Sequence, residues 1–160
     1  MKSIIIIIKT IIAHLIIFFI TLVILSLFSS FNVSNDFAYI IYFVGVLLLY
    51  FYSGYLIGNH LEIKWYQYFG IAILGAIIWG IAFAISPNYL NYKRVDSAGI
   101  WLFYQIYISG IETPLNFIEN KKILSIRLEM YCILLLPVVA SLMQYLGALS
   151  KVNSTSRMYH

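Results

Sequence analysis

Four long apolar runs, separated by short polar stretches, dominate the chain. They cover residues 10–31, 37–58, 65–86 and 130–149, and none of them contains Asp, Glu, Lys or Arg. A helix needs about 20 apolar residues to cross the roughly 30 Å hydrocarbon layer of a bilayer. The pattern therefore predicts an all-α integral membrane protein in which four transmembrane helices form one bundle, with residues 1–160 as a single polytopic domain.

The polar stretches between the runs carry residues that end helices and anchor them at the membrane surface. Residues 34–36 (SND) can cap the second helix, GNHLEIK forms a short turn after it, and Pro87 follows the third. Amphipathic rings prefer the boundary between lipid and water, and aromatic residues gather near these ends: Trp65, Tyr66, Tyr68, Tyr89 and Tyr92. The predicted helices are thus bounded on both sides.

The segment 98–120, between the third and fourth runs, is apolar and aromatic but is interrupted by Gln105, Glu112 and Pro114. Each Ile, Leu or Phe favours insertion by about 0.3 to 0.6 kcal/mol, whereas one Glu near the middle of a crossing costs about 2.5 to 3.5 kcal/mol. We therefore predict an interfacial amphipathic helix here rather than a fifth crossing.

The periodicity of this segment leaves a second interpretation open. Gln105, Ser109 and Glu112 recur on one side, as in a helix lying on a membrane surface. Trp101 and Ile108 fall on the same side, however, so a re-entrant helix packed against the bundle is the alternative. In either arrangement Trp101, Gln105 and Glu112 are candidate interfacial contact residues.

The composition agrees with a lipid environment. Of the 160 residues, 62% are hydrophobic and only 10% are charged, and the mean hydropathy is +0.92, whereas soluble proteins are about half apolar and a quarter charged. The net charge of +4 comes from cations that flank the apolar runs, where they anchor helix ends at lipid headgroups. A nucleic-acid partner is therefore not expected. Heavy use of Ile, Tyr, Asn and Lys is typical of an AT-rich bacterial genome.

The distribution of positive charge does not indicate on which side of the membrane the amino terminus lies. We expect the first run to be retained as a helix, because it exceeds the about 7 to 15 residues of a cleaved signal and no small-x-small site follows it. With the amino end inside, five cations face the cytoplasm and five face outwards, so the positive-inside rule gives a tie. A fifth crossing would give six against four. Since insertion energy is the more direct constraint, we keep four crossings, with both termini on the cytoplasmic side of the cell membrane.

Polar residues inside the runs are the first candidates for a functional site, because each must find a partner or a water-filled cavity. Thr10 and Thr21 share one helix face with His14. In the antiparallel arrangement, four polar side chains lie at similar depth on the amino-terminal side: His14, Tyr55, Gln67 and Gln144. We expect the groups of this candidate intramembrane cluster to join the helices by hydrogen bonds. Binding of a substrate or a proton is the alternative.

The sequence offers no recognisable catalytic, cofactor or metal site. His60 lies in a predicted turn and His160 is the last residue, so neither supplies His14 with a second imidazole for haem or metal. The only cysteine, Cys132, lies inside the fourth run, which excludes an intrachain disulfide and dithiol chemistry. We therefore expect no catalytic residues, no metal and no cofactor.

Small residues at four-residue spacing indicate close helix packing. They occur on the second and third predicted helices: Gly54, Gly58, Ala72, Ala76, Gly80 and Ala84. We expect this face to pack the second helix on the third, with pairing to another chain as the alternative. In the fourth helix, Pro137 removes a backbone donor and should free the carbonyl of Ile133.

The leading functional hypothesis is a small non-catalytic membrane protein that works by protein contact in the bilayer, as an accessory or regulatory subunit or a toxin-immunity protein. A membrane-protein partner or a second copy of the chain is then expected. An oligomeric small-solute transporter or channel is the alternative. A lipid-modifying enzyme is the second alternative, and its site would be assembled at the headgroup level from His60, Glu62, Asp96 or Glu112.

Overall fold

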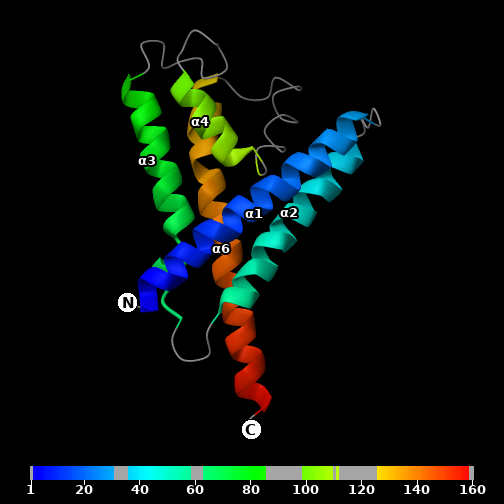
Figure 1. Ribbon diagram of the computed structural model, residues 1–160, viewed down its shortest axis with the longest axis vertical. Helices are drawn as coiled ribbons and strands as arrows, with labels where there is room; N and C mark the ends of the chain where they lie inside the picture. Colours follow the sequence, from blue (N-terminus) through cyan, green and yellow to red (C-terminus); the bar gives the residue numbers. More distant parts are fainter. Residues whose placement is uncertain are drawn as a thin grey trace.

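The computed structural model describes residues 2–30, 36–58, 63–85, 99–109, 111 and 126–158, and the regular structure within them is helical, without strands. The elements, in chain order, are α1 Lys2–Ser30, α2 Asp36–Ile57, the 3-10 turn η1 Trp65–Gln67, α3 Gly70–Ile85, α4 Gly99–Ile108 and α6 Ile126–Met158. Figure 1 shows α1 and α2 side by side, while α3 and α4 lie beside the amino-terminal half of α6. The predicted all-α class is confirmed for these residues.

Three of the described helices contain stretches long and apolar enough to cross a membrane: Ser3–Phe28, Phe37–Ile57 and Tyr131–Ser154. They correspond to the first, second and fourth predicted crossings and support a membrane protein. In place of the third, residues 65–86, the structure has η1 followed by α3, whose 16 residues extend about 24 Å. This is less than the roughly 30 Å hydrocarbon layer, so the fourth crossing stays a prediction.

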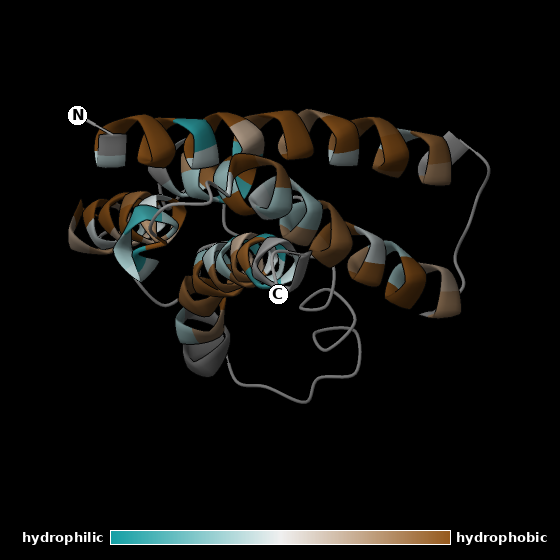
Figure 2. Cartoon of the chain, turned by 90° about the horizontal axis from the view of Figure 1, so that it is seen from below, coloured by the Kyte–Doolittle hydropathy of each residue, from teal (hydrophilic) through white to brown (hydrophobic). Residues whose placement is uncertain are grey.

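Helix α1 buries one narrow stripe and exposes the rest of its surface. The buried residues Thr10, His14, Ile17 and Thr21 recur at i, i+4, i+7 and i+11, which is the spacing of a single helix face. Large apolar side chains such as Phe19 are exposed elsewhere on the helix, and Figure 2 shows α1 as hydrophobic along most of its length. A helix that is apolar all round suits hydrocarbon on its outer side.

The carboxyl-terminal halves of α2 and α6 pack backbone to backbone. A Cβ atom at Gly54 would overlap the main chain of Gln144, and one at Gly147 would overlap the main chain of α2. Gly58 lies against Ala148 one turn further along. Because these pairs advance in the same direction on both helices, α2 and α6 run parallel. Small residues make such a close approach possible.

Helix α4 packs against the bundle. Trp101, Tyr104 and Ile108, at i, i+3 and i+7, are buried, and the ring of Trp101 lies 6.4 Å from that of Trp79 on α3, between centroids. Large aromatic side chains gain most from such burial. One face of the described part of the segment 98–120 thus packs against the bundle, and whether this helix is interfacial or re-entrant stays a prediction.

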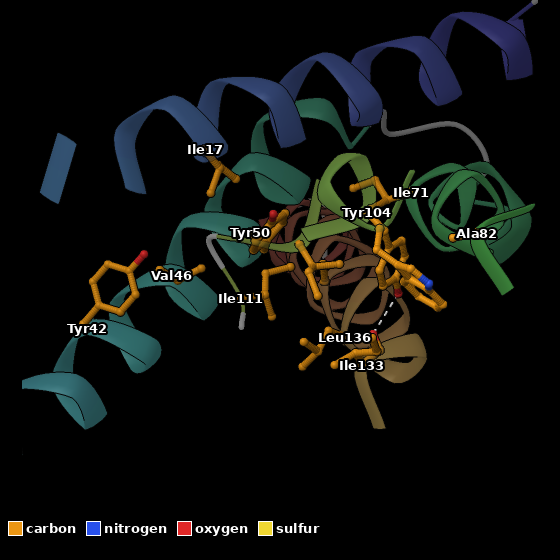
Figure 3. Packing of buried hydrophobic residues seen from close by; sticks show 13 residues of the cluster. Ile17, Tyr42, Val46, Tyr50, Ile71, Ala82, Tyr104, Ile111, Ile133 and Leu136 are labelled. Carbon is orange, nitrogen blue, oxygen red and sulfur yellow. Dashed lines mark hydrogen bonds between the residues drawn. The ribbon is translucent and has the colours of Figure 1, made fainter. Parts of the chain in front are cut away.

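Pro137 lies inside α6 and leaves the carbonyl of Ile133 without the N–H donor that a helix normally supplies. As predicted, that carbonyl is open to another donor, and the hydroxyl of Tyr104 donates to it at 2.9 Å, drawn as a dashed line in Figure 3. On α3, a Cβ atom at Gly75 would come within 2.7 Å of the Pro137 ring. The proline is thus where α3 and α4 both meet α6.

The hydrophobic core receives side chains from each α-helix in the described part of the chain. Figure 3 shows Ile17 from α1, Val46 from α2, Ile71 from α3, Tyr104 from α4 and Ile133 from α6 turned toward this centre. All five are buried. The core therefore sets the relative positions of the helices that carry the buried polar side chains.

Candidate functional site

His14 lies on the buried stripe of α1 and is 3% exposed. Its Nδ1 is 2.7 Å from the hydroxyl of Tyr50 on α2, and its Nε2 is 3.2 Å from the main-chain oxygen of Tyr107 on α4. A carbonyl only accepts, so Nε2 must carry hydrogen. In the neutral ring, Nδ1 therefore accepts a hydrogen bond from Tyr50. Both ring nitrogens are then satisfied by groups from two other helices.

Tyr107 extends this arrangement to a fourth helix. Its ring packs against the imidazole of His14, with centroids 4.6 Å apart and planes tilted by 50°. Its hydroxyl donates to the main-chain oxygen of Ile71 near the start of α3, at 2.6 Å. One histidine and two tyrosines thus connect α1, α2, α3 and α4.

Gln144 of α6 makes a second set of contacts beside the first. Its Nε2 donates to Ser53 Oγ at 3.0 Å and approaches the main-chain oxygen of Thr10 at 3.4 Å. The hydroxyl of Ser53 in turn donates to the main-chain oxygen of Tyr50 at 2.8 Å. Among the described residues, Gln144 Oε1 has no hydrogen-bond partner, and the side chain is fully buried.

These contacts form one connected set, called the polar network below. Its members come from α1, α2, α4 and α6: Thr10, His14, Tyr50, Ser53, Tyr107 and Gln144. In each of its bonds between two helices, at least one of the two groups is a side chain. In an apolar environment, a polar group left without such a partner is unfavourable. The arrangement therefore works chemically as a set of ties between helices.

The predicted cluster of four is only partly brought together. His14 and Gln144 both belong to the polar network, connected through α2. Gln67, in η1, instead donates to the hydroxyl of Ser3 at 3.0 Å. Tyr55 lies beside Lys151, whose ammonium is 5.8 Å from the centre of its ring. The four residues therefore belong to three separate sets of contacts.

Three residues that form hydrogen bonds between helices were not identified from the sequence: Tyr50, Tyr107 and Ser141. Tyr50 and Tyr107, which both contact His14, are two of 14 tyrosines, and the sequence pattern does not separate them from the others. Ser141 of α6 accepts a hydrogen bond at 3.1 Å from the backbone N–H of Ala72. Ala72 belongs to the first turn of α3, where backbone N–H groups have no acceptor within their own helix. The signal available for Ser141 was its position as a polar residue three places before Gln144.

The predicted small-residue face is divided between two locations. Gly54 and Gly58 pack on α6, so the expectation that they pair with the third helix is wrong; α6 offers Gly147 at the crossing, which brings the backbones closer. Ala72 is buried. The remaining three residues stay uncovered on α3 and are called the open face of α3: Ala76, Gly80 and Ala84.

The predicted interfacial residues also separate. Trp101 is 1% exposed and belongs to the core, so it is not a surface contact. Gln105 is half-buried, and Glu112 lies outside the described residues. Within the part of the chain that the structure describes, no three His, Cys, Asp or Glu side chains come together as a metal site would require.

Comparison provides no external assignment for this arrangement. The chain matches no protein-family model, no curated protein and no solved structure.

Proposed function

We propose that the protein is a multi-pass protein of the cell membrane that acts by contact with another membrane protein inside the bilayer, without catalysing a reaction itself. Such a protein would serve as an accessory or regulatory subunit, or as an immunity factor against a membrane-active toxin. The support comes from how its polar groups are used and from which helix face is left uncovered.

The observation that carries the proposal is the open face of α3. Ala76, Gly80 and Ala84 recur at four-residue spacing, and nothing lies within 4 Å of a Cβ atom built at Gly80. The large side chains of Ile73 and Ile77, on the same side by helical spacing, are exposed as well. Elsewhere in this chain, small residues at this spacing allow another helix to approach, as Gly54 and Gly58 do on α2.

The buried polar side chains support contact rather than chemistry. His14, Ser141 and Gln144 each bond to a group on another helix. A catalytic acid or base needs a donor or acceptor atom that can reach the substrate. Most donor and acceptor atoms of these side chains instead form hydrogen bonds to neighbouring helices. Their role is therefore to hold the scaffold that presents the open face.

The direction of the helices supports α3 as the fourth crossing. Since α2 and α6 run parallel, the chain between them must cross the layer an odd number of times. Of the α-helices that the structure describes between them, α3 is the longer, and its exposed neighbours Trp65 and Tyr66 suit the lipid boundary. At 10 residues, α4 extends about 15 Å, half the layer, as a re-entrant helix would.

The test uses two glycines whose Cβ positions are both open. Gly80→Leu places a bulky group on the open face of α3, whereas Gly45→Leu does the same on α2, and neither Cβ would meet an atom within 4 Å. The tagged full-length variants are extracted with mild detergent after crosslinking in the native membrane. We expect a defined partner, or a second copy of the chain, to be lost with Gly80→Leu and kept with Gly45→Leu.

Thermal unfolding of both variants in detergent serves as the control and should match the parent protein. If both leucine variants retain the same co-purifying proteins as the parent, the open face of α3 is not the contact surface and the proposal fails.

A further inference from the structure

A groove of about 330 Å³ lies between α1 and α2. Its walls are mainly aliphatic and include Ile12 and Ile16 from α1 and Leu49 and Leu56 from α2. The volume falls at the lower end of the range of small-ligand pockets, about 300 to 1,000 Å³. Ser53 of the polar network also borders the groove, but the four side chains named here are apolar and lie outside that network.

The groove runs along the two helices. On α1 it extends from Lys9 to Ile17, and on α2 from Ile57 back to Leu49. Eight residues of helix correspond to about 12 Å, compared with about 15 Å for one leaflet of the hydrocarbon layer. The groove therefore has the direction and the length of a single lipid chain in one leaflet.

Positive charge is concentrated at one end of this groove. Lys9 belongs to the lining and is exposed. Lys151 donates to the main-chain oxygen of Leu56, also a lining residue, at 3.4 Å, so a second ammonium is near the same end. Lysines close to the membrane surface attract anionic headgroups and extend along apolar surface to reach them.

We propose that this groove binds one acyl chain of an anionic phospholipid, with the phosphate of its headgroup paired to Lys9. A transmembrane helix fits less well: a cylinder of about 10 Å diameter and 12 Å length encloses about 900 Å³, nearly three times the groove. The site lies on α1 and α2, whereas the proposed contact surface is on α3. The lipid is thus a structural ligand of α1 and α2. Its binding would be a function additional to contact with a partner protein.

Headgroup selectivity is tested by native mass spectrometry of the full-length protein released from vesicles of equal phosphatidylglycerol and phosphatidylcholine. We expect bound phosphatidylglycerol to exceed phosphatidylcholine about fivefold, the factor associated with one lysine near a charged surface. Lys9→Gln should bring the ratio close to one. Lys64→Gln, which removes an exposed lysine outside the lining, should leave it unchanged; an equal loss in both variants overturns the proposal.

The position of the chain is tested with a fluorophore on α1 in the Cys132→Ser background. Ile16→Cys and Phe19→Cys carry the label at positions that are 55% and 64% exposed, but only Ile16 lines the groove. In vesicles where a minority of phosphatidylglycerol has brominated chains, quenching should be stronger at position 16. When the brominated minority lipid is phosphatidylcholine instead, quenching at positions 16 and 19 should be equal. Equal quenching throughout, or crosslinking of two copies through position 16, overturns the proposal.

Discussion

At the scale of single residues, the bond between His14 and Tyr50 illustrates how a polar pair is accommodated among apolar helices. Both side chains are buried, and the bond joins α1 to α2 at 2.7 Å. Hydrogen bonds between membrane helices contribute about 0.6 kcal/mol on average and about 1.7 kcal/mol at most. A buried group left without its partner costs about 1 to 3 kcal/mol. Losing both members should therefore cost less than the sum of the two single losses.

We predict that His14→Phe and Tyr50→Phe each lower the free energy of unfolding by about 1 to 3 kcal/mol, because each leaves a polar atom of the other unpaired. The double variant should lose less than the sum, by a coupling of about 0.6 to 1.7 kcal/mol. Unfolding in mixed detergent measures all three. Tyr52→Phe, on an exposed tyrosine of the same helix, should have little effect. Strictly additive losses would show that the pair is not coupled.

Sequence reasoning could identify one side of this pair but not the other. His14 and Gln144 are conspicuous because each interrupts a long apolar run. Tyr50 is one of 14 tyrosines, and the choice among them depends on the register between α1 and α2, which only the packed structure determines. The same holds for Tyr107, whose main-chain oxygen and ring both contact His14.

At the scale of elements, α6 shows how a proline can be kept inside a long helix. The helix ladder is interrupted at Pro137, and the hydroxyl of Tyr104 supplies the donor that the carbonyl of Ile133 would otherwise lack. Neighbouring helices commonly compensate for proline in membrane helices in this way. Because Tyr104 belongs to α4, this bond also joins α4 to α6 at the position where the proline interrupts the helix.

We predict that Tyr104→Phe lowers the free energy of unfolding by about 1 kcal/mol in the parent chain. In the Pro137→Ala background the loss should nearly vanish, because the new N–H at position 137 can donate to the Ile133 carbonyl. Unfolding of the four variants in mixed detergent provides the cycle. The same loss in both backgrounds would contradict this account, and the bond would then not compensate for the proline.

The lengths and pairings of the helices were not equally predictable. Apolar runs located α1, α2 and α6, because hydrophobicity and length suffice for a long helix. Helix α3 is shorter than predicted, since residues 65–67 form the 3-10 turn η1, in which Gln67 bonds to Ser3, and the α-helix begins only at Gly70. The partner of Gly54 was also unpredictable, because a small residue permits close approach without specifying which helix approaches.

At the scale of the whole molecule, three lysines lie toward one end of the bundle, whereas Arg127 stands at the start of α6, at the other end. Lys9 lies near the start of α1, Lys64 just before η1, and Lys151 toward the end of α6, and Figure 1 shows these three parts of the chain in its lower half. Parallel α2 and α6 both end there. Under the four-crossing proposal, this end faces the cytoplasm, whereas α3 ends on the opposite side.

The last prediction concerns the side on which each helix ends. In the Cys132→Ser background, single cysteines replace Lys64, Ile85 and Lys151, and intact cells are treated with a membrane-impermeant maleimide. If α3 crosses the layer, Ile85→Cys should react from outside, whereas Lys64→Cys and Lys151→Cys should react only after the cells are opened. Reaction of positions 64 and 85 from the same side would mean that α3 does not cross. The odd number of crossings that parallel α2 and α6 demand would then not come from the described helices between them, because α4 spans only about half of the layer.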